Sequence, residues 1–214
     1  MVPKPYFADL DETDLILTDM NKAVFLDKDG TLIVDVPYNI DPNRIVLEEG
    51  AEKALQLLKK AGFLLVIISN QGGIAKGVIQ EQQLAGVEQR INELLAEVEI
   101  RLDGFFYCPH DPKGKIAAYT KSCYCRKPAP GLLLQAASVL NIDLEASWMI
   151  GDILNDVEAG HRAGCRSILI DNGNETEWLL NDYRIPDFFA DNLQEAAAYI
   201  QMVAKTYDYE SDIL

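Results

Sequence analysis

The stretch Ala23-Val24-Phe25-Leu26-Asp27-Lys28-Asp29-Gly30-Thr31 decides the fold, because a short apolar run ends abruptly in two aspartates, a glycine and a threonine. An uninterrupted apolar run bounded by turn residues is typical of a strand buried on both faces, as in parallel sheets covered by helices. Ligands of such sheets bind outside the carboxyl ends of the strands, which is where Asp27 falls. The sequence therefore places two carboxylates at the carboxyl edge of the predicted sheet.

Asp27 and Asp29 can serve the same small volume in different roles. Asp27 is a candidate nucleophile or ligand of a hard cation, and Asp29 a candidate proton carrier. Magnesium takes one or two carboxylates and leaves room for the phosphate oxygens of a substrate. An ordinary Asp-Gly turn is the alternative interpretation. A calcium loop fits less well, since Leu32 and Tyr38 stand where such a loop needs glycine and glutamate.

Composition narrows the class of protein. The chain has 214 residues, of which 49% are hydrophobic and 25% charged, as in soluble globular proteins. The net charge of −15 argues against nucleic acid or an anionic membrane surface as a partner. The start has no signal-peptide pattern and the longest apolar run, residues 63–68, is too short to cross a bilayer. We therefore expect a cytoplasmic monomer or small homo-oligomer.

Segments of strand and helix character alternate along the chain, which predicts an α/β fold with a doubly wound parallel sheet. After the opening strand, further strands are expected at residues 63–69, 104–108, 148–152, 167–171 and 188–190. Helices are expected at residues 51–61, 84–102, 130–140, 157–163 and 192–204. The pattern predicts one domain.

The domain is expected to span residues 21–207, between an acidic extension at residues 1–20 and a tail at residues 208–214. No large insertion separates the polar strand ends, so no separate cap domain is expected. Three loops must then shape the pocket, and they are residues 32–48, 70–77 and 109–125.

Three of the four cysteines and one of the two histidines crowd into one segment. They are Cys108, His110, Cys123 and Cys125. Three thiolates and one imidazole make a closed tetrahedral set that suits a structural zinc ion, with no open position for a catalytic water. Free thiols or a disulfide are the alternatives, although Cys123 and Cys125 are too close in sequence to bridge well. A zinc-binding loop is therefore predicted.

Four strand ends in succession carry polar groups, and their order resembles a known superfamily. The motifs are D-x-D-G-T at Asp27, S-N-Q at Ser69, R-K-P at Arg126 and G-D-x-x-x-D at Asp152. This order resembles the haloacid dehalogenase (HAD) superfamily of phosphohydrolases. The runs LDGFFYCPHDPKGK, CYCRKPAPGLLL and WMIGD resemble more narrowly its heptose 1,7-bisphosphate and histidinol-phosphate phosphatases. The likeness covers roughly residues 23–175.

The resemblance implies roles for five side chains. Asp27 would attack phosphorus and become an aspartyl phosphate, while Asp29 would protonate the leaving oxygen and later deprotonate the attacking water. Magnesium would be held by the Asp27 carboxylate, the backbone carbonyl of Asp29, and Asp152. Ser69 and Lys127 would stabilise the oxygens of the transferred phosphoryl group.

The same resemblance implies a substrate pocket. Arg126 would recognise a second phosphate, for which its planar fork is suited. The loops that line the sugar would contribute Asp35, Tyr38, Asn70, Gln71 and Gly72. Two departures from the family pattern concern specificity: Ile153 stands where a lysine is usual, and Pro37 where a glycine is common. The first is expected to weaken phosphate binding or to change the substrate.

The resulting interpretation is a magnesium-dependent phosphomonoesterase that acts on a small phosphorylated metabolite. Heptose 1,7-bisphosphate is the expected substrate, and histidinol phosphate is the alternative. A receiver-type signalling domain, which also phosphorylates an aspartate, is an alternative of another class, and an inactive zinc-containing binding module is a third. Asp156 is interpreted chiefly as a charge at a helix N-terminus, and Tyr38 can equally be a packed surface aromatic.

Overall fold

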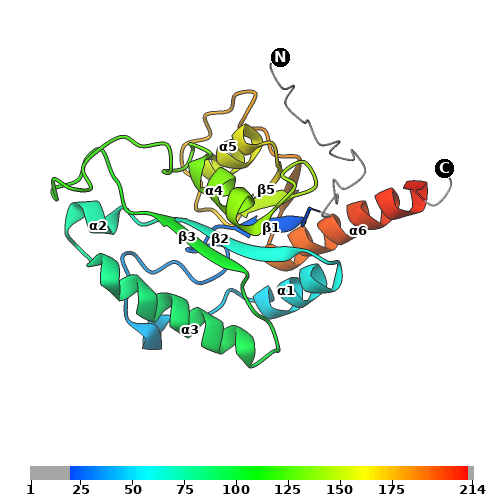
Figure 1. Ribbon diagram of the computed structural model, residues 1–214, viewed down its shortest axis with the longest axis horizontal. Helices are drawn as coiled ribbons and strands as arrows, with labels where there is room; N and C mark the ends of the chain where they lie inside the picture. Colours follow the sequence, from blue (N-terminus) through cyan, green and yellow to red (C-terminus); the bar gives the residue numbers. More distant parts are fainter. Residues whose placement is uncertain (1–19, 212–214) are drawn as a thin grey trace, which may run out of the picture.

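One parallel sheet forms the centre of the protein. The computed structural model describes residues 20–211, so the predicted extension lies outside the described residues except for Met20, as do residues 212–214 (Figure 1). The strands are β1 (Ala23–Leu26), β2 (Leu64–Asn70), β3 (Gly104–Cys108), β4 (Trp148–Gly151), β5 (Arg166–Ile170) and β6 (Phe188–Ala190). Their order in the sheet is β3-β2-β1-β4-β5-β6. Strands β2 and β3 are added on one side of β1 and strands β4 to β6 on the other, so the strand order reverses between β1 and β4. Ligands bind at such a switch point.

Helices cover both faces of the sheet, as Figure 1 shows. Val24 and Leu26 pack with α1 (Ala51–Lys60), α3 (Leu84–Ala96) and α6 (Leu193–Ser211). Ala23 and Phe25 pack on the opposite face with α4 (Gly131–Leu140) and α5 (Leu154–Ala163). All four β1 side chains are fully buried, as a strand between two helical layers requires. The predicted doubly wound α/β fold is confirmed.

Element boundaries differ from the prediction in three helices. α3 ends at Ala96 rather than near residue 102, because Glu99 takes a left-handed backbone conformation (φ +59°) and the Ile100 N–H closes onto the Leu95 carbonyl. Leu102 remains buried although it lies outside the helix. α5 begins earlier than expected and α6 runs to Ser211. The short helix α2 (Gly73–Lys76) was not predicted.

Within residues 20–211, the helices lack the combined length and apolar character that a membrane span requires.

Candidate active site

The loop after β1 folds tightly against the end of β4. The Asp27 N–H donates to the Ile150 carbonyl (2.9 Å), which continues the pairing of the two strands. Gly30 has a φ of +80°, and a Cβ there would lie 2.2 Å from Asp152 Oδ2. Only glycine allows this close approach without strain. The loop therefore brings the carboxylates of Asp27 and Asp152 to one point.

Three buried carboxylates meet at this point. Oxygens of Asp27, Asp152 and Asp156 lie within 4.8 Å of one another. The Lys127 ammonium lies 2.6 Å from Asp27 Oδ1 and 2.6 Å from Asp156 Oδ1, and it also donates to the Ile68 carbonyl. With all four side chains ionised, three negative charges face one positive charge. A divalent cation with oxygen ligands would balance this excess, so the donor set fits magnesium.

Asp156 is more than a charge at a helix N-terminus. It is fully buried, and its carboxylate accepts from the Ile153 N–H as well as pairing with Lys127. Gly151 makes this position possible, because a Cβ there would lie 2.2 Å from Asp156 Oδ2. The G-D-x-x-x-D motif was the available signal, because it places one aspartate directly after β4 and the other in the first turn of α5.

Burial controls the protonation of this cluster. It raises the pKa of Asp156 to about 7 in spite of the neighbouring Lys127 ammonium. Burial and the Asp27 charge together raise the pKa of Asp152 to about 6. Burial also opposes the charge of Lys127, but Asp156 and Asp27 outweigh it and raise the lysine pKa. Without a metal ion, the site therefore retains protons to unusually high pH.

We expect the magnesium-free protein to lose stability as pH rises from about 4 to 7. In this window the folded protein binds more protons than the unfolded chain, because both acids have pKa values above their ordinary 3.8. The melting temperature should fall, and saturating magnesium should reduce the fall by favouring the ionised acids. Circular dichroism melts of the wild type and of Asp156→Asn isolate the effect, since the melting temperature of the variant should fall less over the same pH range. An equal fall in both proteins contradicts the assignment.

The predicted acid and phosphoryl-binding residues are linked by hydrogen bonds. Gln71 Nε2 donates to the buried Ser69 Oγ (2.8 Å) and lies 3.4 Å from Asp29 Oδ2. Burial raises the pKa of Asp29, although its ion pair with Lys28 opposes the shift. A carboxyl group with a raised pKa is suited to donate a proton.

Asn70 has a positioning role that the sequence did not reveal. Its side-chain oxygen accepts from the Lys127 N–H and its amide donates to the Lys127 carbonyl, both at 3.0 Å. Because β2 carries Asn70, this pair attaches the loop before α4 to the sheet. The amide thereby holds the backbone from which the Lys127 ammonium enters the acid cluster.

One small cavity contains every residue predicted to bind substrate. Its volume is about 220 Å³. The predicted lining residues are Asp35, Tyr38, Asn70, Gln71, Gly72 and Arg126, and all of them line it. Asp29 also lines the cavity, together with Lys28, Pro37, Asn39, Gly73 and Lys76. The structure therefore brings the expected acid and the expected specificity residues to one hollow.

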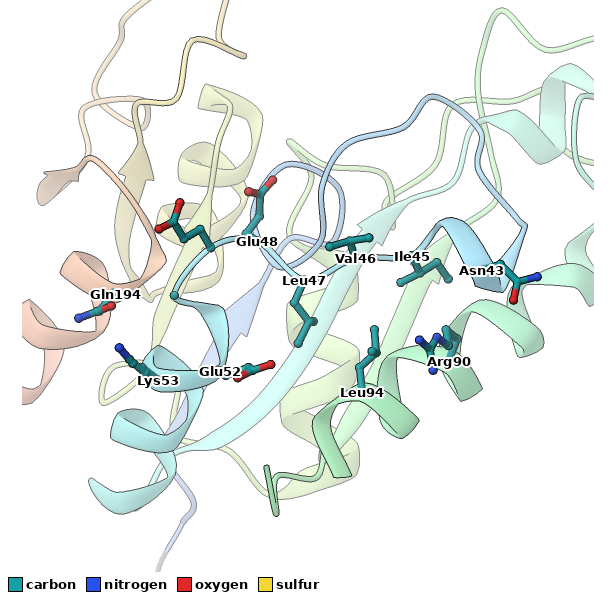
Figure 2. A pocket seen from close by; sticks show the side chains of 12 residues that line it. Asn43, Ile45, Val46, Leu47, Glu48, Glu52, Lys53, Arg90, Leu94 and Gln194 are labelled. Carbon is teal, nitrogen blue, oxygen red and sulfur yellow. The ribbon is translucent and has the colours of Figure 1, made fainter. Parts of the chain in front are cut away.

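A larger hollow of about 540 Å³ lies apart from these residues, between segment 43–53, α3 and Gln194 of α6 (Figure 2). Its lining includes Glu48, Glu49 and Glu52, and it contains no predicted site residue. Three carboxylates outnumber the two cations of the lining, Lys53 and Arg90, so size alone does not make this hollow a phosphate-binding site.

The predicted zinc ligands also converge. Sulfur–sulfur distances among Cys108, Cys123 and Cys125 are 3.0–3.4 Å, and His110 Nδ1 lies 3.3 Å from Cys125 Sγ. The four donor atoms lie within 4.8 Å of one another, and none of the cysteines is in a disulfide. Three sulfurs and one ring nitrogen fit a closed, soft-ligand metal site. The disulfide alternative is not realised.

Comparison with known proteins identifies the family. A family model described as HAD-hydrolase-like matches residues 124–196, which include Lys127, Asp152 and Asp156. The D-glycero-β-D-manno-heptose-1,7-bisphosphate 7-phosphatase of Yersinia pestis is 38% identical, covering 77% of this chain and 93% of that protein. This chain belongs to the haloacid dehalogenase family. Family members with this similarity are named as phosphatases, and the chain is a phosphatase of this type.

Other relatives of this HAD phosphatase agree. The Escherichia coli K12 protein of the same name is 39% identical, over 74% of this chain and 88% of that protein. A HAD-like phosphatase from Mesorhizobium loti superposes with a TM-score of 0.75 at 33% identity, covering 86% of this chain and 87% of that one. The heptose bisphosphate phosphatase of B. bronchiseptica, solved with magnesium and phosphate, has a TM-score of 0.70 at 26% identity, with coverages of 85% and 98%.

Proposed function

We propose that this HAD phosphatase hydrolyses a phosphate ester of D-glycero-D-manno-heptose 1,7-bisphosphate. The observation that carries the proposal is the polar cavity that Asp29 lines with Arg126. Asp29 connects this cavity to the acid cluster, since it follows Asp27 by two residues and the Asp27 charge helps to raise its pKa. Relatives that share most of the chain are named for this substrate. A compact sugar with two phosphates suits a small hollow lined by both acids and cations.

In the proposed mechanism, an oxygen of Asp27 forms a bond to phosphorus while the bond from phosphorus to the sugar oxygen breaks. Asp29 gives its proton to that leaving oxygen. Asp29 then takes a proton from water, which attacks phosphorus and releases inorganic phosphate from Asp27. Lys127, at 2.6 Å from Asp27, pairs with the nucleophile and would face the phosphoryl oxygens together with Ser69.

Magnesium would be held by the carboxylates of Asp27 and Asp152 and by the backbone carbonyl of Asp29. The excess of carboxylates over ammonium groups in the cluster supports this assignment. When bound, the ion would neutralise charge on the phosphoryl group. Asn174 donates to Asp152 Oδ2 (2.7 Å), which orients the carboxylate toward its partners.

The cysteine–histidine cluster is proposed to hold zinc in a structural role. Cys125 is followed directly by Arg126 and Lys127, and Arg126 Nη1 donates to the His110 carbonyl (3.0 Å). A metal ion at the cluster would thus fix both cations through the backbone. Its contribution to catalysis is expected to be indirect.

Removal of zinc should lower both stability and turnover. We expect a strong chelator, with magnesium restored to saturation, to lower the melting temperature and the rate of phosphate release together, because the loop that carries Lys127 loses its anchor. Metal content by mass spectrometry accompanies each measurement. Cys125→Ser should reproduce the loss, while Cys165→Ser, outside the cluster, should retain zinc. Unchanged melting and turnover in zinc-free protein would disprove the structural role.

A phosphate-release screen tests the proposed function. The substrates are sugar bisphosphates, sugar monophosphates and histidinol phosphate, with Asp27→Asn as the blank. The highest kcat/KM on a heptose bisphosphate supports the proposal, and a preference for histidinol phosphate contradicts it. A lasting phosphoaspartate without release of phosphate would favour a signalling domain instead.

A further inference from the structure

Lys76 is a cation of the cavity that the motifs did not identify. It is the last residue of α2, and its Nζ donates to the Tyr38 hydroxyl (3.0 Å) and lies 5.4 Å from the centre of that ring. Its side chain is 38% exposed, and it lines the cavity with Tyr38 and Arg126. The ammonium is therefore held in place while part of it stays open to a ligand.

A single carboxylate links Lys76 to Arg126. Asp111 Oδ2 lies 3.7 Å from Lys76 Nζ and 3.6 Å from Arg126 Nη2. Asp111 is 7% exposed and its other oxygen accepts from the Lys113 N–H (2.9 Å), so its direction is set by the backbone. Asp111 is not among the residues that line the cavity. One carboxylate outside the cavity lining therefore contacts both cations.

The charged side chains at the cavity fall into two groups of ion pairs. Lys28 pairs with Asp29, and the nearby Asp35 carboxylate belongs to this group because its charge helps to raise the pKa of Asp29. Lys76 and Arg126 carry two positive charges against the one carboxylate of Asp111. An ammonium has three N–H donors and a guanidinium five, more than their protein partners use here. Lys76 and Arg126 together therefore retain both charge and donors for an anion.

We propose that Lys76 and Arg126 form one anion subsite that takes the second phosphate of a bisphosphorylated substrate, with Asp111 as the positioning residue. The proposal rests on the proposed function and adds Lys76 to its site. Two cations held in place before binding lose little freedom when phosphate arrives, which favours affinity for the bisphosphate over the monophosphate. The subsite acts on binding, not on the chemical step.

The test compares two substrates that differ only in the second phosphate, a sugar 1,7-bisphosphate and its 7-monophosphate. Lys76→Gln should raise KM for the bisphosphate about tenfold and leave its kcat within about twofold, as expected for a lost charge-assisted hydrogen bond. The kcat/KM for the monophosphate should change less than about twofold. Lys76→Arg should restore much of the affinity. Lys60→Gln, an exposed lysine at the end of α1 and outside the cavity lining, is the matched control.

Equal losses on the two substrates, or no change on either, would overturn the subsite. A wild-type enzyme that releases phosphate from neither ester contradicts the proposed function instead. The subsite is then tested by calorimetric binding of the intact bisphosphate to Asp27→Asn, with and without Lys76→Gln. About tenfold weaker binding in the double variant supports the subsite, and equal binding overturns it.

Discussion

Replacing Asp27 with asparagine is expected to reduce kcat by at least about 10⁴-fold, since an amide cannot take the place of the attacking carboxylate. The fold should be retained. Asp27 is one of three carboxylates around Lys127, and Asp156 still pairs with the lysine in the variant. In magnesium-free buffer the melting temperature should stay the same or rise, because one source of repulsion between buried acids is removed.

Phosphate release and thermal melts of the same preparations separate these effects. Asp191→Asn makes the same chemical change on an exposed residue and should leave kcat unchanged. A residual kcat within about tenfold of wild type would exclude Asp27 as the nucleophile. A large fall in the melting temperature would show that Asp27 is needed for folding, and the kinetic result would then say nothing about the chemistry.

Lys127→Met is expected to remove both activity and stability. Lys127 is 3% exposed and lies between Asp27 and Asp156, so the variant leaves buried carboxylates without a counter-ion. Breaking a buried ion pair from one side typically costs about 3–5 kcal/mol. Urea unfolding in magnesium-free buffer measures the loss. The loss should be smaller at pH 5 than at pH 8. At pH 5 Asp156, whose pKa is already raised to about 7, is protonated and needs no counter-ion.

A second substitution distinguishes the two consequences of losing Lys127. Lys127→Met combined with Asp156→Asn removes one of the acids that the lysine balanced, so much of the stability should return. Turnover should not return, because no ammonium faces the phosphoryl group. A double variant as unstable as Lys127→Met alone would show that the lysine stabilises the protein through its packing and not through its charge.

The fold and the centre of the site could be predicted because both depend on local pattern. A short apolar run ending in Asp27 indicated a buried parallel strand, and parallel strands bring their carboxyl ends to one edge. The metal-ligand pairs that begin at Cys108 and Cys123 can bind one ion only if the loop between them folds back on itself. Each of these features is visible in a short contiguous segment of sequence.

Other features depend on contacts between distant segments, which the pattern does not contain. Asp156 is buried because Gly151 leaves room for it, and Asn70 pairs with a backbone from another part of the chain. The link between Lys76 and Asp111 joins α2 to the cysteine loop. The end of α3 was misplaced because Leu102 is buried by a chain reversal and continues the helical pattern without being helical.

The short connection from Cys125 to Lys127 has a consequence for the cell that makes this enzyme. With zinc at the cluster, the supply of one metal would govern a reaction for which a second metal, magnesium, is proposed. Scarcity of zinc would then slow phosphate release even where magnesium is plentiful, and the growth medium alone would lower the activity of an unaltered protein.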